Sequence, residues 1–198
     1  MFALPPAKRV RLLSLLGAFL GLTAVGATAQ NQPPTAVAKD VTVDASANCD
    51  AIVTPADVDD GSSDPDGDPL TLSLAPVGPY PLGETEVTLT VEDGNGGSDT
   101  DTAIITVEDN TPPTIVCPAD ITVGNDVGEC GAVVTFEAPA TDNCPGVTVA
   151  YSTDPGTLFP VGTTTVTATA TDVGGNTASC EFTVTVNDTE PPVITCPE

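Results

Sequence analysis

The sequence predicts an all-β protein in which tandem antiparallel Ig-like β-sandwiches follow an N-terminal export signal. Three observations support this prediction. The N-terminus carries an apolar stretch that ends in a small-residue cleavage motif, the rest of the chain repeats about every 80 residues, and short runs of alternating apolar and polar residues lie between turn-forming clusters.

The N-terminus predicts secretion. A basic segment, Lys8, Arg9 and Arg11, precedes an apolar stretch from Leu12 to Val25. Ala27-Thr28-Ala29 then has the small-x-small pattern of a signal peptidase site, so we expect a signal peptide at 1–29, cleaved between Ala29 and Gln30. The alternative is a membrane anchor, but a spanning helix needs about 20 apolar residues, more than this stretch contains. We therefore expect a secreted or cell-surface chain that does not itself insert into the membrane.

The charge of the mature chain limits its partners. Lys39 is the single base that remains against 28 acids, which gives a net charge of 1 − 28 = −27. Such a surface repels phosphate groups, so nucleic acid and anionic lipid are excluded as partners. We expect a surface or matrix protein or a glycan instead. Cations are the natural counter-charge, although acidity also serves solubility alone.

An internal repeat sets the domain organisation. Three evenly spaced motifs begin at positions 33, 112 and 191: Pro33-Pro34-Thr35, Pro112-Pro113-Thr114 and Pro191-Pro192-Val193. We therefore expect one domain at 30–111, a second at 112–190, and the start of a truncated third repeat at 191–198. The chain is then either a truncated product or a piece of a longer array.

Alternation within each repeat predicts strands. Apolar residues occupy every second position of three runs: Val87, Leu89 and Val91; Val166, Ala168 and Ala170; Phe182, Val184 and Val186. Clusters of Gly, Asn and Asp at 94–97 and 174–176 predict turns between the runs. Several short strands in about 80 residues need two facing sheets to bury the apolar side, because a single ribbon cannot.

The second repeat resembles the hyalin repeat (HYR) family over nearly all of 112–190. The matching segments are Thr114-Ile115-Val116-Cys117-Pro118, Cys130, Thr141-Asp142-Asn143-Cys144-Pro145, Phe159-Pro160-Val161-Gly162-Thr163 and Cys180-Glu181-Phe182-Thr183-Val184-Thr185-Val186. The resemblance implies an Ig-like fold, an extracellular setting and a role in cell adhesion or surface architecture, and it brings no catalytic residues.

The first repeat resembles the same family in a degenerate form. Ala38 stands near the position of the first cysteine, Asp101 replaces the last one, and the Asn-Cys-Pro motif is missing. The segment 63–69 instead resembles loops of bacterial cadherin-like and PKD-like modules.

The cysteines predict disulfides, because an exported chain meets an oxidising compartment. The four cysteines of the second repeat allow three connectivities. In an Ig-like sandwich the loop with Cys144 and the turn before Cys180 should lie at the same end, so we expect Cys144–Cys180, which leaves Cys117–Cys130. We expect Cys49 to be a stranded thiol and Cys196 to lack a partner within the chain. Crosslinking of these two to another chain is the alternative.

Calcium is the one ligand that the sequence favours. Asp64, Asp66 and Asp68 alternate around Gly67, so their carboxylate oxygens could converge within one turn. The EF-hand pattern fails, because Ala75 stands where its final Glu belongs. Further acids lie in the linkers 108–110 and 187–190. The alternative is a set of ordinary hydrated Asx turns.

The sequence predicts that the chain is not an enzyme. It has no histidine, which excludes Ser-His-Asp and Cys-His sites, and its carboxylates lie in loops where water keeps them ionised. We expect a non-catalytic structural or adhesion module. The alternatives are a calcium-binding cadherin-like module and an accessory domain of a larger secreted enzyme.

Overall fold

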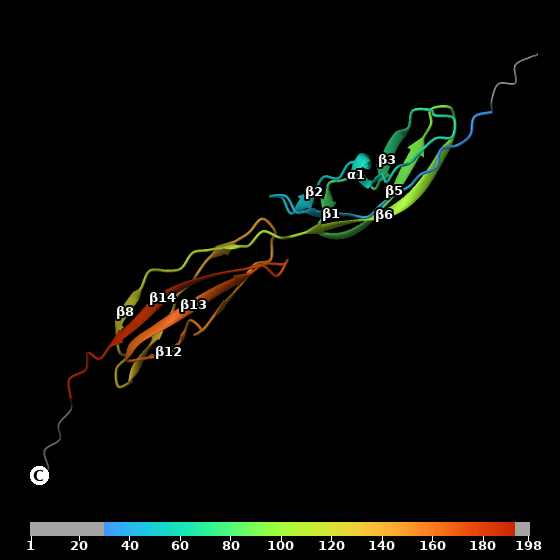
Figure 1. The fold of residues 1–198 in the computed structure, drawn as a ribbon. Helices are drawn as coiled ribbons and strands as arrows, with labels where there is room; N and C mark the ends of the chain where they lie inside the picture. The colour runs from blue at the N-terminus through green and yellow to red at the C-terminus, as the bar shows by residue number, and fades with distance from the viewer. Residues whose placement is uncertain (1–29, 193–198) are drawn as a thin grey trace, which may run out of the picture. The chain divides into compact units, whose positions relative to one another are not determined.

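The computed structural model describes residues 30–192 as two β-sandwiches, one after the other along the chain (Figure 1). The expected signal peptide, the Ala29 side of its cleavage site and Cys196 lie outside the described residues. Within the described part of the chain, no helix has the length and apolar character needed to cross a bilayer.

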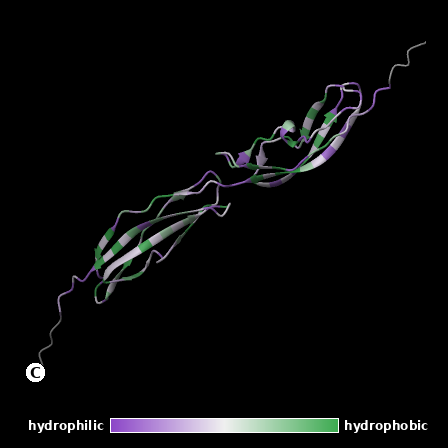
Figure 2. Cartoon of the chain, viewed as in Figure 1, coloured by the Kyte–Doolittle hydropathy of each residue, from purple (hydrophilic) through white to green (hydrophobic). Residues whose placement is uncertain are grey.

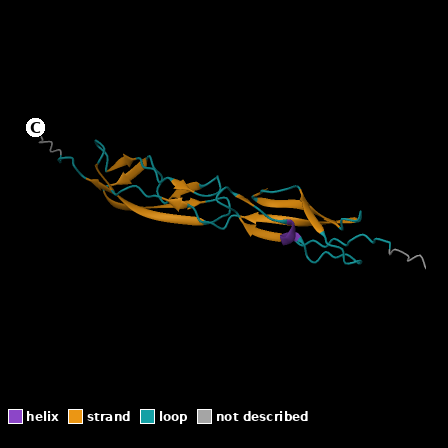
Figure 3. Cartoon of the chain, turned by 90° about the horizontal axis from the view of Figure 1, so that it is seen from above, coloured by secondary structure: helices purple, strands orange, loops and turns teal. Residues whose placement is uncertain are grey.

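The first sandwich is formed by six strands and one short helix. These elements are β1 (Val41–Asp44), β2 (Asp50–Ala51), α1 (Pro55–Val58), β3 (Thr71–Ala75), β4 (Tyr80–Pro81), β5 (Gly83–Glu92) and β6 (Ser98–Glu108). One sheet has the order β1-β6-β5-β3, and β2 pairs with β4 in the other layer. The helix α1 is the only one among the described residues (Figure 3). It begins at Pro55, whose fixed φ suits a first helical position, and Thr54 and Asp57 form a capping box.

The second sandwich repeats this plan. Its strands are β7 (Thr114–Ile115), β8 (Ile121–Gly124), β9 (Gly131–Val134), β10 (Ala140–Thr141), β11 (Thr148–Tyr151), β12 (Thr157–Pro160), β13 (Gly162–Thr171) and β14 (Thr177–Asn187). One sheet has the order β11-β13-β14-β8, and the pairs β12-β9 and β10-β7 form the other layer. In each sandwich a short strand that follows the Pro-Pro motif, β1 or β8, runs parallel to the last strand, β6 or β14.

The expected alternation is confirmed. The apolar positions named above in β5, β13 and β14 are all buried, and the residues between them are more exposed. Figure 2 shows this as green segments interspersed with paler ones along the long strands. In the second sandwich Phe136 packs edge-to-face on Tyr151, Phe159 and Phe182, with ring centroids 5.4, 5.9 and 4.9 Å away. Each sandwich thus has its own apolar core.

Equivalent buried aspartates close the long hairpins. Asp93 follows β5, and Asp172 follows β13 at the same place in the second repeat. The Asp93 carboxylate accepts the backbone N–H groups of Asn95 and Gly97 at 2.7 and 2.9 Å, and Asp172 accepts that of Asn176 at 2.8 Å. These bonds satisfy the turn's backbone donors and hold both acids where the hairpin ends.

Candidate functional site

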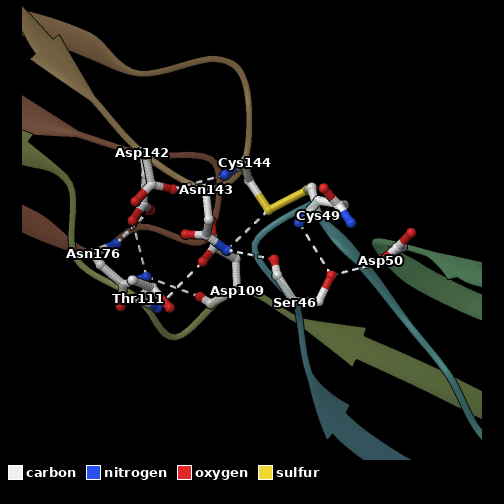
Figure 4. The surroundings of a disulfide bond; sticks show 11 residues. Ser46, Cys49, Asp50, Asp109, Thr111, Asp142, Asn143, Cys144 and Asn176 are labelled. Carbon is white, nitrogen blue, oxygen red and sulfur yellow. Dashed lines mark hydrogen bonds between the residues drawn. A yellow bond between two sulfur atoms is a disulfide. The ribbon is translucent and has the colours of Figure 1, made fainter.

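The candidate site is the group of loops around the Cys49–Cys144 disulfide (Figure 4). Cys49 lies in the turn between β1 and β2 of the first sandwich, and Cys144 lies in the loop after β10 of the second. Their Cα atoms are 4.8 Å apart. Beside the bond, the Asn143 side-chain amide donates a hydrogen bond to the carbonyl oxygen of Ser46 at 3.2 Å. The two repeats are therefore joined by a covalent bond in addition to the linker.

The second disulfide lies within the HYR-like repeat. Cys117, just after β7, is bonded to Cys180 in β14, with Cα atoms 5.8 Å apart. It ties the first strand of the repeat to the last, and in the loop-entropy picture such a closure stabilises a small domain by about 4 kcal/mol.

These two bonds correct the expected pairing. The structure does not form Cys117–Cys130 or Cys144–Cys180, and Cys49 is not a stranded thiol. The expected pairing is wrong because it assumed that Cys144 pairs within its own repeat. The loop that carries Cys144 instead lies against the first sandwich. Among the described cysteines, Cys130 is left unpaired and exposed, and it lines a surface hollow with Asn125, Glu129 and Val161.

The first repeat shows how the sequence could have given the right pair. Ala38 and Asp101 stand one repeat before Cys117 and Cys180, at the equivalent positions, so both cysteines of one disulfide are missing together. In the structure they still meet, because the Ala38 N–H donates a 2.8 Å hydrogen bond to the Asp101 carboxylate. This bond lowers the pKa of Asp101 below its usual value. The absence of both cysteines from the first repeat therefore indicates that Cys117 and Cys180 pair with each other in the second.

The predicted metal residues Asp64, Asp66 and Asp68 come together in the structure, each with a carboxylate oxygen within 4.8 Å of the others. Protein donors contact all three, although the Asp64 Oδ2 atom is buried and accepts no hydrogen bond from the described residues. The Asp64 carboxylate accepts the backbone N–H groups of Asp66 and Asp68 at 2.8 and 3.1 Å, which is the geometry of an Asx turn. Asp66 accepts the Gln32 N–H at 2.7 Å, and Asp68 accepts the Asn95 amide at 2.8 Å. Calcium at this loop stays a prediction.

A second acidic group lies near the disulfide, and the sequence did not single it out as a set. Asp109 directly follows β6, Asp142 follows β10, and Asp172 lies in the turn between β13 and β14. One carboxylate oxygen of each lies within 4.8 Å of the other two. The sequence shows Asp109 as one of the linker acids, but strand pairing is needed to bring it close to Asp142 and Asp172, which are distant in the chain.

Close backbone approach makes this group possible. A Cβ at Gly174 would lie 2.1 Å from the carbonyl oxygen of Asp109, so only glycine lets the hairpin turn reach the linker. The Asn176 amide bridges the two segments, donating to the Asp109 carbonyl at 2.8 Å and to the Asp172 carboxylate at 3.0 Å.

The comparison with known proteins agrees with the sequence resemblance. Residues 108–186 match the HYR domain family. The chain is 42% identical over 126 residues to hyalin of Lytechinus variegatus, a match that covers 60% of this chain and 24% of that protein. It is 37% identical over 135 residues to hyalin of Strongylocentrotus purpuratus, covering 64% and 11%. The chain thus spans a quarter or less of the length of these curated relatives.

The solved structures that match this chain include cadherin repeats. A human protocadherin-24 EC1-2 structure matches with a TM-score of 0.40 and 19% identity over 80% of this chain and 100% of that one. Drosophila N-cadherin EC1-4 matches with a TM-score of 0.42 and 16% identity over 81% and 50%. Together with the two disulfides and the hyalin relatives, the family match makes the chain an extracellular protein whose residues 108–186 are a HYR domain.

Proposed function

We propose that the chain is a non-catalytic module of an extracellular adhesive or structural layer, in which covalently joined sandwiches act as one unit. The Cys49–Cys144 bond carries this proposal. A disulfide between neighbouring repeats limits their independent motion and lets the pair transmit tension, which a spacer for a separate catalytic domain does not require. The hyalin relatives, which are extracellular proteins, support the same class of function.

Adhesion is tested with beads that carry the secreted mature chain. We expect such beads to bind an extracellular matrix layer, or one another, more strongly than beads that carry an unrelated protein of equal negative charge. The charge-matched control matters because a net charge of −27 after signal removal, that is 1 − 28, attracts cations and basic proteins without specificity. Equal binding by the two kinds of bead would contradict the adhesive role.

A calcium-dependent form of this module is the second candidate, and the convergence of Asp64, Asp66 and Asp68 favours it. Carboxylate oxygens are the ligands that calcium prefers. If this loop holds an ion, Asp64→Asn abolishes a calcium-dependent rise in the melting temperature of the first sandwich. An unchanged rise in that variant would exclude the Asp64 loop.

A further inference from the structure

We propose that Asp109, Asp142 and Asp172 bind a calcium ion, with the side-chain oxygen of Asn143 as a fourth protein ligand. Figure 4 shows Asp109, Asp142 and Asn143 gathered beside the Cys49–Cys144 bond. The inference concerns the ion alone and does not depend on what the module adheres to.

Two buried oxygen atoms at this place lack a hydrogen-bond donor. Asp109 is only 5% exposed, and its Oδ2 atom accepts no hydrogen bond from any described group, while its Oδ1 atom accepts the Thr111 N–H at 3.2 Å. The Oδ1 atom of Asn143 is also buried without a donor among the described residues. Buried acceptors without a partner are rare because desolvating them costs free energy, so they indicate a ligand that is not part of the chain.

The charge of the cluster also calls for a cation. Three carboxylates converge, and Asp109 and Asp172 are both buried. Lys39 is the only lysine or arginine in residues 30–192, and it forms an ion pair with Asp60 at 3.7 Å. The described chain therefore offers no side-chain cation to these acids, and like charges out of water are unfavourable unless they are paired or bound to a metal.

The ligand chemistry favours calcium among metal ions. All the donors are hard oxygens, and two oxygens that bind calcium at about 2.3–2.6 Å can be up to about 5 Å apart. The carboxylate oxygens of the cluster lie within 4.8 Å of one another. The bonds that Asp142 and Asp172 already accept, from the N–H of Cys144 and from Asn176, leave free lone pairs, because each carboxylate has about four acceptor positions. Zinc is disfavoured because it prefers nitrogen and sulfur ligands.

The first repeat provides an internal comparison. Ser63 bridges Thr35 as Thr141 pairs with Thr114, so Asp64 is the counterpart of Asp142, and Asp93 is that of Asp172. The counterpart of Asp109, one repeat earlier, is Gln30. There the Asn31 amide of the linker donates to the Asp93 carboxylate at 2.8 Å. The first repeat lacks the third carboxylate at this place. In the second repeat Asn110 is the counterpart of Asn31, and its amide donates to the Asp44 carboxylate at 2.9 Å and not to the acidic cluster.

The location gives the ion a structural effect. Asp109 belongs to the linker that leaves β6, whereas Asp142, Asn143 and Asp172 belong to loops of the second sandwich. A bound ion therefore fastens the linker to the second sandwich, next to the inter-repeat disulfide. Binding to the folded form alone also stabilises that form by mass action.

The test measures calcium binding by the full mature chain. Titration calorimetry with calcium chloride, and thermal unfolding in EDTA and in millimolar calcium, are applied to the unaltered chain and to Asp109→Asn and Asp142→Asn. We expect one site of millimolar or tighter affinity, and a rise in melting temperature of roughly 5 °C or more with calcium. Each variant should lose at least about tenfold in affinity, because it loses a charged ligand. Circular dichroism in EDTA confirms that the variants fold.

Asp188→Asn is the matched control, and Asp64→Asn measures any contribution from the Asp64 loop. Asp188 is the counterpart of Asp109 one repeat later, and it is exposed and belongs to neither acidic cluster. Retention of calcium binding in Asp188→Asn, together with its loss in Asp109→Asn and Asp142→Asn, supports the site. The proposal is overturned if the unaltered chain shows neither binding heat nor a thermal shift, if the shift persists in both Asp109→Asn and Asp142→Asn, or if Asp64→Asn alone removes it.

Discussion

At the scale of single residues, backbone donors and carboxylates form a repeated contact in this acidic chain. Asp120 accepts the Thr183 N–H at 2.8 Å, and Asp40 accepts the Ile104 N–H at the same distance in the first repeat. Each bond fastens the segment before β8 or β1 to the last strand of its sandwich. These hydrogen bonds could not be predicted from the sequence, because the backbone N–H that a carboxylate accepts depends on the strand that it lies against.

Acid should destabilise the fold through such carboxylates. Hydrogen bonds from the backbone N–H and then the hydroxyl of Thr183 hold the pKa of Asp120 below its ordinary value of 3.8. A group whose pKa is lowered by folding contributes stability above its unfolded pKa and loses it as the pH falls through the folded value. We expect the melting temperature in EDTA to be level near neutral pH and to fall below about pH 4. Asp120→Asn should weaken this dependence, and an unchanged profile would exclude Asp120 as a contributor.

Phe159 tests the core of the second sandwich. It is fully buried, so Phe159→Ala should lower the free energy of unfolding by about 3–5 kcal/mol, as expected when a large core side chain is removed. Its neighbour Leu158 is 52% exposed, and Leu158→Ala should change stability by only about 0.5 kcal/mol. Urea unfolding of the two variants compares these values. Equal losses would show that β12 does not have the described orientation.

At the scale of elements, the alternation of apolar and polar residues was enough to predict the long hairpins. The apolar positions of β5, β13 and β14 are buried as expected. The short elements were harder to predict. The helix α1 has only four residues and depends on a proline and a capping box, and β7 and β10 have two residues each, too few for periodicity to show.

A hydrogen bond holds the start of the first sandwich to its last strand, and a disulfide does so in the second. A disulfide can therefore be introduced at the equivalent positions of the first sandwich. Ala38 and Asp101 occupy the positions that Cys117 and Cys180 occupy one repeat later. The double variant Ala38→Cys with Asp101→Cys should therefore form a third disulfide and raise the stability of the first sandwich by about 2–4 kcal/mol. Intact mass with and without reduction detects the bond, and Ala38→Ser with Asp101→Ser is the matched control. Two free thiols at these positions in the oxidised double variant would contradict their equivalence.

At the scale of the whole molecule, the sequence predicted two sandwiches in tandem but not the bond between them. The Asn143-Cys144-Pro145 motif marks the loop that reaches the first repeat, yet sequence spacing cannot show that Cys49, 95 residues earlier, lies opposite it. The acidic cluster could not be predicted from the sequence for the same reason, because Asp109, Asp142 and Asp172 come together only when the linker and two loops are folded.

The inter-repeat bond should limit how far the chain can be stretched. Because Cys49 and Cys144 are 95 residues apart, the bond shortens the path along which the unfolded chain can be stretched. At about 3.3–3.6 Å per residue, the fully unfolded oxidised chain should be shorter than the reduced chain by more than about 300 Å. Single-molecule extension with and without reductant measures this difference. Cys49→Ser should be longer than the unaltered oxidised chain in the absence of reductant, because only the Cys117–Cys180 constraint then remains, and equal lengths would contradict the bond.

Peptide mapping of the secreted chain under non-reducing conditions, with free thiols blocked first, tests most directly the claim that the two sandwiches form one covalently joined unit. The account predicts crosslinked peptides for Cys49–Cys144 and Cys117–Cys180, and a blocked thiol at Cys130. Peptides that join Cys144 to Cys180, or a blocked thiol at Cys49, would contradict it.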